Sequence, residues 1–277
     1  GVIADFDAAE QMLKMFIQKS NEGRGIIAPR LIIGIPSGVT SVERRAVREA
    51  GLAGAREVHL IDEPVAAAIG ASLPVTEPIG TMIVDIGGGT TEVAVLSLGG
   101  TVLSESVRVA GDEINDSIGI YLKKVHNLVV GERTAEDIKI KIGSAFPNDD
   151  FDKTSMEVRG LHLLSGLPRC INLTSGEIRE AMADPLSKIV EAVKRTLERT
   201  PPELAADIVD RGIMLAGGGA LVRGISDLVS HETGIFTHIA EDPLLCVVNG
   251  CGEVLDDFKK LRRVVDTPDF ARNAIRD

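Results

Sequence analysis

The residues best suited to chemistry lie in one stretch, where an acid ends a short apolar run and glycines and threonines follow. Backbone N–H groups in a glycine turn can form a concave site for an anion such as phosphate. An acid at a strand end can hold a hydrated Mg²⁺, which prefers oxygen ligands. The glycines alone would also fit an ordinary hairpin. The predicted metal residue is Asp85, and the predicted phosphate-binding residues are Gly87, Gly88, Gly89, Thr90 and Thr91.

A second triple glycine follows another predicted strand much later in the chain. Gly217, Gly218 and Gly219 end this strand, and Ala220 lies at the start of the next predicted helix. A helix N-terminus after a glycine turn suits a phosphate or a closely approaching nucleoside. Two such turns together favour a ligand site over two unrelated hairpins.

Three further charged residues have both a functional and a structural interpretation. Glu63 precedes Pro64 at a predicted helix start, where it is either a favourable charge on the helix dipole or a carboxylate that orients an attacking water. Glu136 and Lys139 lie three residues apart on one helix face and by themselves predict a surface ion pair.

The loop 23–29 contains an apolar pair, Ile26 and Ile27, between its glycines and a proline. The pair either packs beneath the loop as a small satellite core or is exposed and inserts into a membrane or a partner.

The elements that position these residues predict an α/β protein. Capping-box patterns at Thr40–Glu43 and Thr174–Glu177 predict helix starts, and a third start is expected at Asp184–Pro185. Alanines and a glycine in the helix after Pro64 predict a close crossing with another helix. The predicted strands span 30–36, 57–61, 81–95 with its turn, and 101–109, the last two forming an antiparallel meander, and short strands lie within 146–173.

Composition excludes several classes of protein. The 277 residues are 44% hydrophobic, and the formal net charge of −11 argues against a nucleic-acid partner, which needs clustered Lys and Arg. The three cysteines form no CxxC pair, which favours a reducing cytosol, and no HExxH pattern indicates zinc. Neither a membrane-spanning run nor a signal peptide is found. Because the chain begins at Gly1 and opens into a helix, we expect it to lack its N-terminus.

Taken in order, these features resemble the nucleotide-binding superfamily of actin, the seventy-kilodalton heat-shock chaperones and the sugar kinases. Within it, nearly the whole chain resembles the MreB family of bacterial actins. The resemblance rests on the segments GVIADFDAAEQML, VERRAVREA, DEPVAAAIGA, DIGGGTTEVAV, GERTAEDIKIKIGSAFP, LPRCINLTSGEIREA and LAGGGALVRG.

The resemblance implies an actin-like ATPase (ribonuclease H-like) two-domain fold whose first domain is incomplete. Residues 1–78 and 247–277 would form the partial domain I. Residues 79–114 and 179–246 would form the nucleotide-binding core of domain II, with 115–178 as its small subdomain. Helices 64–70 and 249–258 would be the crossing connectors between the domains.

The resemblance also assigns roles to the residues above. The cofactors would be ATP and Mg²⁺, with Asp85 on the metal side and the Gly87–Thr91 turn on the phosphates. Glu63 would position the hydrolytic water, Glu136 and Lys139 would lie beside ribose and adenine, and Gly217–Ala220 would contact adenosine. ATP would be hydrolysed by attack of water on the γ-phosphate, and this hydrolysis would be coupled to polymerisation.

The implied function is a cytoskeletal one in bacteria. The protein would assemble with itself into filaments, contact the membrane through Ile26 and Ile27, and organise membrane-bound cell-wall synthesis proteins to maintain rod shape. Its location would be cytoplasmic, at the inner face of the cell membrane. The alternatives are a small-molecule kinase, a chaperone-type ATPase of the same superfamily, and a related filament or division protein.

One departure bears on activity. The family has a first phosphate loop of Asp-x-Gly-Thr type in an N-terminal hairpin, and this sequence contains no such motif ahead of its first helix. We therefore expect the chain as given to bind ATP weakly or not at all, and the full protein to bind it.

Overall fold

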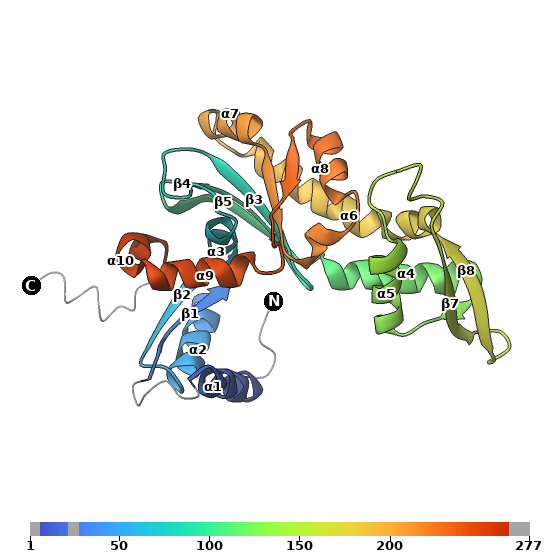
Figure 1. The fold of residues 1–277 in the computed structure, drawn as a ribbon, viewed down its shortest axis with the longest axis horizontal. Coiled ribbons are helices and arrows are strands. Elements are labelled where there is room, and N and C mark those ends of the chain that lie inside the picture. Colours follow the sequence, from blue (N-terminus) through green and yellow to red (C-terminus); the bar gives the residue numbers. More distant parts are fainter. Residues whose placement is uncertain (1–5, 22–27, 266–277) are drawn as a thin grey trace, which may run out of the picture.

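The computed structural model describes residues 6–21 and 28–265 as a mixed α/β protein (Figure 1). Within these ranges the strands form three sheets, and helices cover them. None of the helices described has both the length and the apolar character needed to cross a membrane. The membrane prediction for Ile26 and Ile27 lies outside the described residues.

The elements are named as in Figure 1. The strands are β1 (Arg30–Ile35), β2 (Glu57–Asp62), β3 (Thr81–Ile86), β4 (Thr91–Ser97), β5 (Gly100–Val107), β6 (Leu128–Val129), β7 (Ser155–His162), β8 (Pro168–Thr174), β9 (Ile213–Ala216) and β10 (Thr237–Ile239). The helices are α1 (Phe6–Asn21), α2 (Ser41–Leu52), α3 (Glu63–Gly70), α4 (Gly111–His126), α5 (Glu132–Ile142), α6 (Ser175–Glu198), α7 (Pro202–Arg211), α8 (Ile225–Thr233), α9 (Cys246–Asp256) and α10 (Phe258–Leu261), with 3-10 turns η1 (Gly218–Leu221) and η2 (Arg262–Val264).

The five-stranded sheet, in the order β10-β9-β3-β4-β5, places the two glycine turns side by side. β3 and β9 are parallel neighbours, and Asp85 near the end of β3 lies opposite Ala216 at the end of β9. The glycine turns that follow the two strands therefore lie at the same edge of the sheet. β3, β4 and β5 form the predicted antiparallel meander. Strand alternation puts Val84 into the larger hydrophobic core on one face and Ile83 into a second core on the other.

The second core contains α3 and α9, which lie between the small parallel β1–β2 sheet and the five-stranded sheet (Figure 1). The two helices cross at glycines. A Cβ on Gly70 would lie 1.9 Å from the carbonyl oxygen of Cys246, and one on Gly250 would lie 1.9 Å from that of Ala66. The predicted close crossing is confirmed, because only glycine permits backbones to approach this closely.

The predicted helix start at Asp184–Pro185 is wrong. One helix, α6, runs continuously from Ser175 to Glu198 with Pro185 inside it. An internal proline removes a helix hydrogen bond and costs about 3 kcal/mol in an exposed helix. Here the buried face of α6 passes through Pro185, and packing of its apolar neighbours offsets that cost: Ile178, Met182, Leu186 and Ile189.

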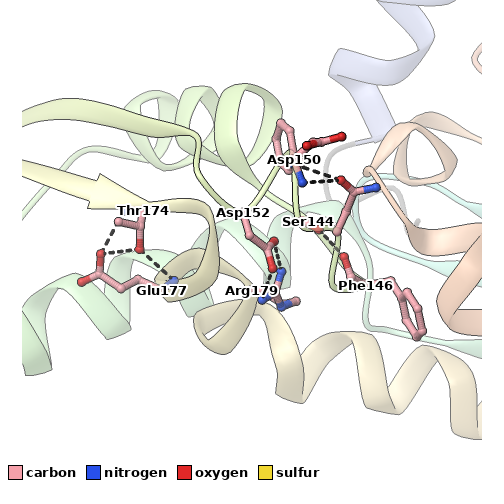
Figure 2. Close-up of polar contacts among 9 residues, drawn as sticks. Ser144, Phe146, Asp150, Asp152, Thr174, Glu177 and Arg179 are labelled. Carbon is pink, nitrogen blue, oxygen red and sulfur yellow. Dashed lines mark hydrogen bonds and ion pairs between the residues drawn. The ribbon is translucent and has the colours of Figure 1, made fainter.

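The start of α6 is fixed by polar contacts that Figure 2 shows. Thr174 and Glu177 form the predicted capping box, with the Thr174 backbone N–H donating to Glu177 Oε2 over 2.9 Å. One turn later, Arg179 Nη2 donates to Asp152 Oδ2 over 2.9 Å. These contacts attach the α5–β7 connection and the β6-β7-β8 sheet to the helix. The predicted short strands in this part of the chain are confirmed as β7 and β8.

Candidate functional site

Most of the predicted site residues line one cavity of about 710 Å³ at the edge where β3 and β9 end. The start of α3, the start of α4, α5 and the segment before α9 also contribute lining residues. The predicted residues that line it are Glu63, Asp85, Gly87, Gly88, Glu136, Lys139, Gly217, Gly218 and Gly219.

Four predicted residues lie elsewhere. Gly89 and Thr90 line a second cavity of about 440 Å³ on the other side of the first turn. Thr91 is fully buried, and its hydroxyl donates to the carbonyl oxygen of Val109 over 2.7 Å. Ala220 is also fully buried, beneath the second turn. Their proposed roles at a phosphate or nucleoside stay predictions, and the Thr91 hydroxyl already has an acceptor within the protein.

The first glycine turn presents free donors. Gly87 N–H closes the turn by donating to the Thr90 carbonyl over 2.9 Å. Among the described residues, the N–H groups of Gly88 and Gly89 donate to no acceptor. The start of α4 packs on the same turn, since Asp112 N–H donates to the Gly88 carbonyl over 2.8 Å. Unpaired N–H groups beside a helix N-terminus form a site that favours an anion.

The second glycine turn packs on β3 instead. Gly217 has φ +80°, and its N–H donates to the Pro243 carbonyl over 2.8 Å. A Cβ on Gly217 would lie 2.4 Å from Asp85 Oδ1, and one on Gly219 would lie 2.2 Å from Ile86 Cγ2. Close approach of the β9 backbone to β3 therefore requires these glycines.

Three carboxylates meet next to the first turn. Burial, with the nearby charges of Asp85 and Glu92, raises the pKa of Glu63 to about 7. Burial, and then Glu92, raises the pKa of Asp85 to about 6. Burial also raises the pKa of Glu92 above its usual range, although hydrogen bonds from Ser106 and Ser37 oppose this shift. Buried carboxylates close to one another favour a cation at the site.

Lys139 brings a cationic group to the cavity. Its ammonium donates to the Gly111 carbonyl over 3.1 Å at the start of α4. Burial lowers the pKa of Lys139, while Glu136 and Asp112 oppose that change. Within the described residues Glu136 and Lys139 form no ion pair; both side chains instead line the cavity. The helix spacing therefore directs them to the same site.

Glu92, Asp112 and Arg223 belong to the site surroundings but are absent from the predicted set. Strand alternation could have identified Glu92, because it lies on the same face of β4 as the buried Ala94 and opposite Asp85. Asp112 begins α4 directly after Gly111 and could have been found as an N-terminal acid. Arg223 follows the second turn, and no sequence pattern singles it out.

The N–H groups and carboxylates of the cavity fit a nucleotide with Mg²⁺. Free turn N–H groups match phosphate oxygens, and the buried acids match a divalent cation. No group of three or more His, Cys, Asp or Glu side chains in the described part of the chain could hold a metal ion by itself. A Mg²⁺ beside Asp85 would therefore take most of its ligands from water and phosphate, as this ion commonly does.

Comparison with known proteins identifies the family. The family model described as MreB/Mbl protein matches residues 1–263. The chain belongs to the MreB/Mbl family. It is similar to the cell shape-determining protein MreB of Escherichia coli strain K12, with 52% identity over 258 residues that cover 92% of this chain and 74% of that protein. This result agrees with the resemblance found in the sequence.

Solved structures give the same fold. The crystal structure of MreB5 of Spiroplasma citri bound to ADP matches with a TM-score of 0.89 and 39% identity, covering 94% of this chain and 78% of that one. The same protein bound to AMPPNP matches with a TM-score of 0.87 and 38% identity over the same shares. A MamK double helical filament matches with a TM-score of 0.77 over 93% of this chain and 78% of that one. At 19% identity, MamK shows the fold alone. The predicted actin-like fold class is thereby confirmed for this MreB/Mbl chain.

Proposed function

We propose that this MreB/Mbl chain is an ATP-dependent cytoskeletal protein that assembles into filaments and maintains rod cell shape. The observation that carries the proposal is the single cavity in which two glycine turns, the carboxylates of Glu63 and Asp85, and the ammonium of Lys139 converge. The nucleotide-bound MreB5 structures and the name of the E. coli relative support it.

ATP would lie along this cavity. The N–H group of Gly88, which lines this cavity and has no acceptor among the described residues, would bind phosphate oxygens, and Asp85 would face the Mg²⁺ through water. Glu136 and Lys139 would lie beside ribose and adenine, and the turn after β9 would contact adenosine. Bound Mg²⁺ would supply charge stabilisation for the phosphates.

Hydrolysis would use Glu63. Water attacks the γ-phosphorus, the bond from that phosphorus to the β–γ bridging oxygen breaks, and the proton of the water passes to the Glu63 carboxylate. A carboxylate with a pKa of about 7 has the basicity that suits proton transfer at neutral pH. Positioning and charge stabilisation supply most of the catalysis in phosphoryl transfer.

A binding and turnover experiment tests this part. With the protein expressed from its complete gene, Glu63→Gln should keep ATP affinity within about threefold and lower kcat by about 100-fold, as expected for loss of a general base. Glu136→Gln, which changes another acid of the same cavity, is the matched control and should change affinity more than kcat. Full activity in Glu63→Gln would exclude the proposed role.

Filament assembly is the second part of the proposal, and MamK filaments of the same fold support it. Electron microscopy and pelleting with ATP should show filaments without any added substrate. Phosphorylation of a sugar in the absence of filaments would instead indicate the small-molecule kinase, and stimulation by unfolded peptide would indicate the chaperone. The family match favours the filament.

The proposed location is the inner face of the cell membrane, where the filament would organise membrane-bound cell-wall synthesis proteins. Because the chain carries a net charge of −11, contact with lipid would come from apolar insertion of Ile26 and Ile27. Changing both residues to Ser should abolish co-sedimentation with liposomes and leave ATP binding unchanged. Unchanged co-sedimentation would contradict the proposed membrane contact.

A further inference from the structure

Glu92 is a buried acid that the proposed chemistry does not use. Only 1% of its surface is exposed. It lies directly opposite Asp85 in the β3–β4 ladder and directly opposite Ser106 in the β4–β5 ladder. The three side chains therefore share one face of the sheet, the face that carries α3. Burying a carboxylate is unfavourable unless hydrogen bonds compensate for the lost water.

The compensating hydrogen bonds come from two different parts of the molecule. Ser106 on β5 donates its hydroxyl to Glu92 Oε1 over 2.5 Å. Ser37, in the loop between β1 and α2, donates its backbone N–H to Oε2 over 3.3 Å. Gly38 of this loop and Ser106 of β5 also line the same cavity, so the loop lies beside β5. One carboxylate thus joins the loop of the β1–β2 layer to the five-stranded sheet.

This loop connects to Glu63 by a short series of contacts. The loop ends at Thr40, the N-cap of α2. One turn into α2, Arg44 Nη2 donates to Asp62 Oδ1 over 2.8 Å, and Asp62 directly precedes Glu63. Glu92 itself lies two residues after Thr90 of the first glycine turn. The contacts of Glu92 therefore link the position of Glu63 to the position of the first glycine turn.

We propose that Glu92 is a positioning residue that holds the β1–α2 loop, and through it Glu63, at a fixed place relative to the first glycine turn. The inference rests on the proposed function, in which Glu63 acts on a water beside the γ-phosphate. Glu92 acts through Glu63 and does not contact the nucleotide.

The test compares four variants of the protein expressed from its complete gene. Glu92→Ala should lower kcat for ATP hydrolysis by about 10- to 100-fold, the loss that follows a misplacement of about 1 Å, with KM changed less than about threefold. Glu92→Gln can accept from Ser37 and donate to Ser106, so it should recover most of the activity. Ser106→Ala should lower kcat by a few-fold. Ser104→Ala, the same substitution two residues earlier on β5 and opposite Ala94, is the matched control and should change nothing.

Hydrogen exchange of the nucleotide-free protein gives a readout that does not depend on hydrolysis. The segment 36–40 should exchange faster in Glu92→Ala and Ser106→Ala than in the wild type or Ser104→Ala. Unchanged kcat and unchanged exchange in both variants would overturn the inference. If Glu92→Ala does not fold, Ser106→Ala decides, because it removes a single hydroxyl from an exposed residue. If the wild type does not hydrolyse ATP, the proposed function fails, and exchange alone decides whether Glu92 holds the loop.

Discussion

The two glycine turns have the same sequence pattern but different structural reasons for it. After β9, the backbone φ of Gly217 is +80°, and a Cβ on Gly217 or Gly219 would overlap atoms of β3. After β3, a Cβ on Gly88 would meet nothing closer than the Asp112 carboxylate at 3.7 Å. Packing within the protein therefore requires Gly217 and Gly219 but not Gly88. The Gly88 N–H and the space beside it are available for a ligand.

The largest expected effect concerns the second turn. Gly217→Ala combines an unfavourable positive φ with overlap against Asp85 and the Ile86 backbone. We expect it to lower the free energy of unfolding by about 3–5 kcal/mol, the sum of backbone strain and overpacking. Urea denaturation measures this loss, with Gly252→Ala, where a Cβ meets nothing within 4 Å, as the control. If Gly217→Ala is as stable as the wild type, packing does not require this glycine, and the two turns do not differ in their packing.

The next effect concerns Asp85, which lies between the two turns. The pKa values of about 6 for Asp85 and about 7 for Glu63 exceed their ordinary values of 3.8 and 4.5, so the folded chain binds more protons than the unfolded chain between these limits. The extra proton binding stabilises the folded chain. This contribution to the free energy of unfolding is fully present below the ordinary pKa values and is lost as pH rises through about 6 to 7. Without nucleotide, the free energy of unfolding should be about 3–4 kcal/mol lower at about pH 8 than at about pH 5.

Urea denaturation across this pH range measures the loss. Asp85→Asn removes one of the two titrating carboxyls and should reduce the difference by about half. Stability that rises over the same range would contradict the raised pKa values.

A smaller effect on folding, but a clear one on ligand affinity, is expected at the first turn. Gly88→Ala should weaken ATP binding by about tenfold, or ~1.4 kcal/mol, because the added methyl occupies space beside the free N–H groups. Its free energy of unfolding should stay within about 0.5 kcal/mol of the wild type. Titration calorimetry and urea denaturation together separate the two quantities. Loss of stability without loss of affinity would mean that Gly88 is needed for packing.

The smallest expected effects distinguish the adjacent threonines. Thr91→Val removes the donor to the Val109 carbonyl and should lower the free energy of unfolding by about 1–2 kcal/mol, with ATP affinity unchanged. Thr90→Val should leave the free energy of unfolding unchanged, because the Thr90 hydroxyl has no partner among the described residues. It should lower the rate of hydrolysis if Thr90 contacts the phosphates as the sequence predicts. Urea denaturation and an ATPase assay on both variants check this. A loss of stability in Thr90→Val and a loss of hydrolysis in Thr91→Val would contradict the prediction.

Several predictions from sequence were correct because they depend on neighbouring residues. The capping boxes at Thr40 and Thr174 begin α2 and α6, and the meander follows from strand alternation and glycine turns. The helix boundary at Pro185 was wrong because packing of the buried face of α6 outweighs the local effect of a proline. Strand alternation could have placed Glu92 beside Asp85, but its contact with Ser37, 55 residues earlier in the chain, depends on the tertiary fold.

The sequence by itself determined the family, the mixed α/β class and half of the residues that line the cavity, since motif spacing and local periodicity contain that information. Only the tertiary structure decided that β3 and β9 are parallel neighbours, so that two distant glycine turns share one edge. It also decided that Thr91 bonds within the protein, while the N–H groups of Gly88 and Gly89 find no acceptor in the part of the chain that the structure describes. The physical reason is that hydrogen-bond pairing and steric room depend on which distant segments meet, and a local pattern does not specify those partners.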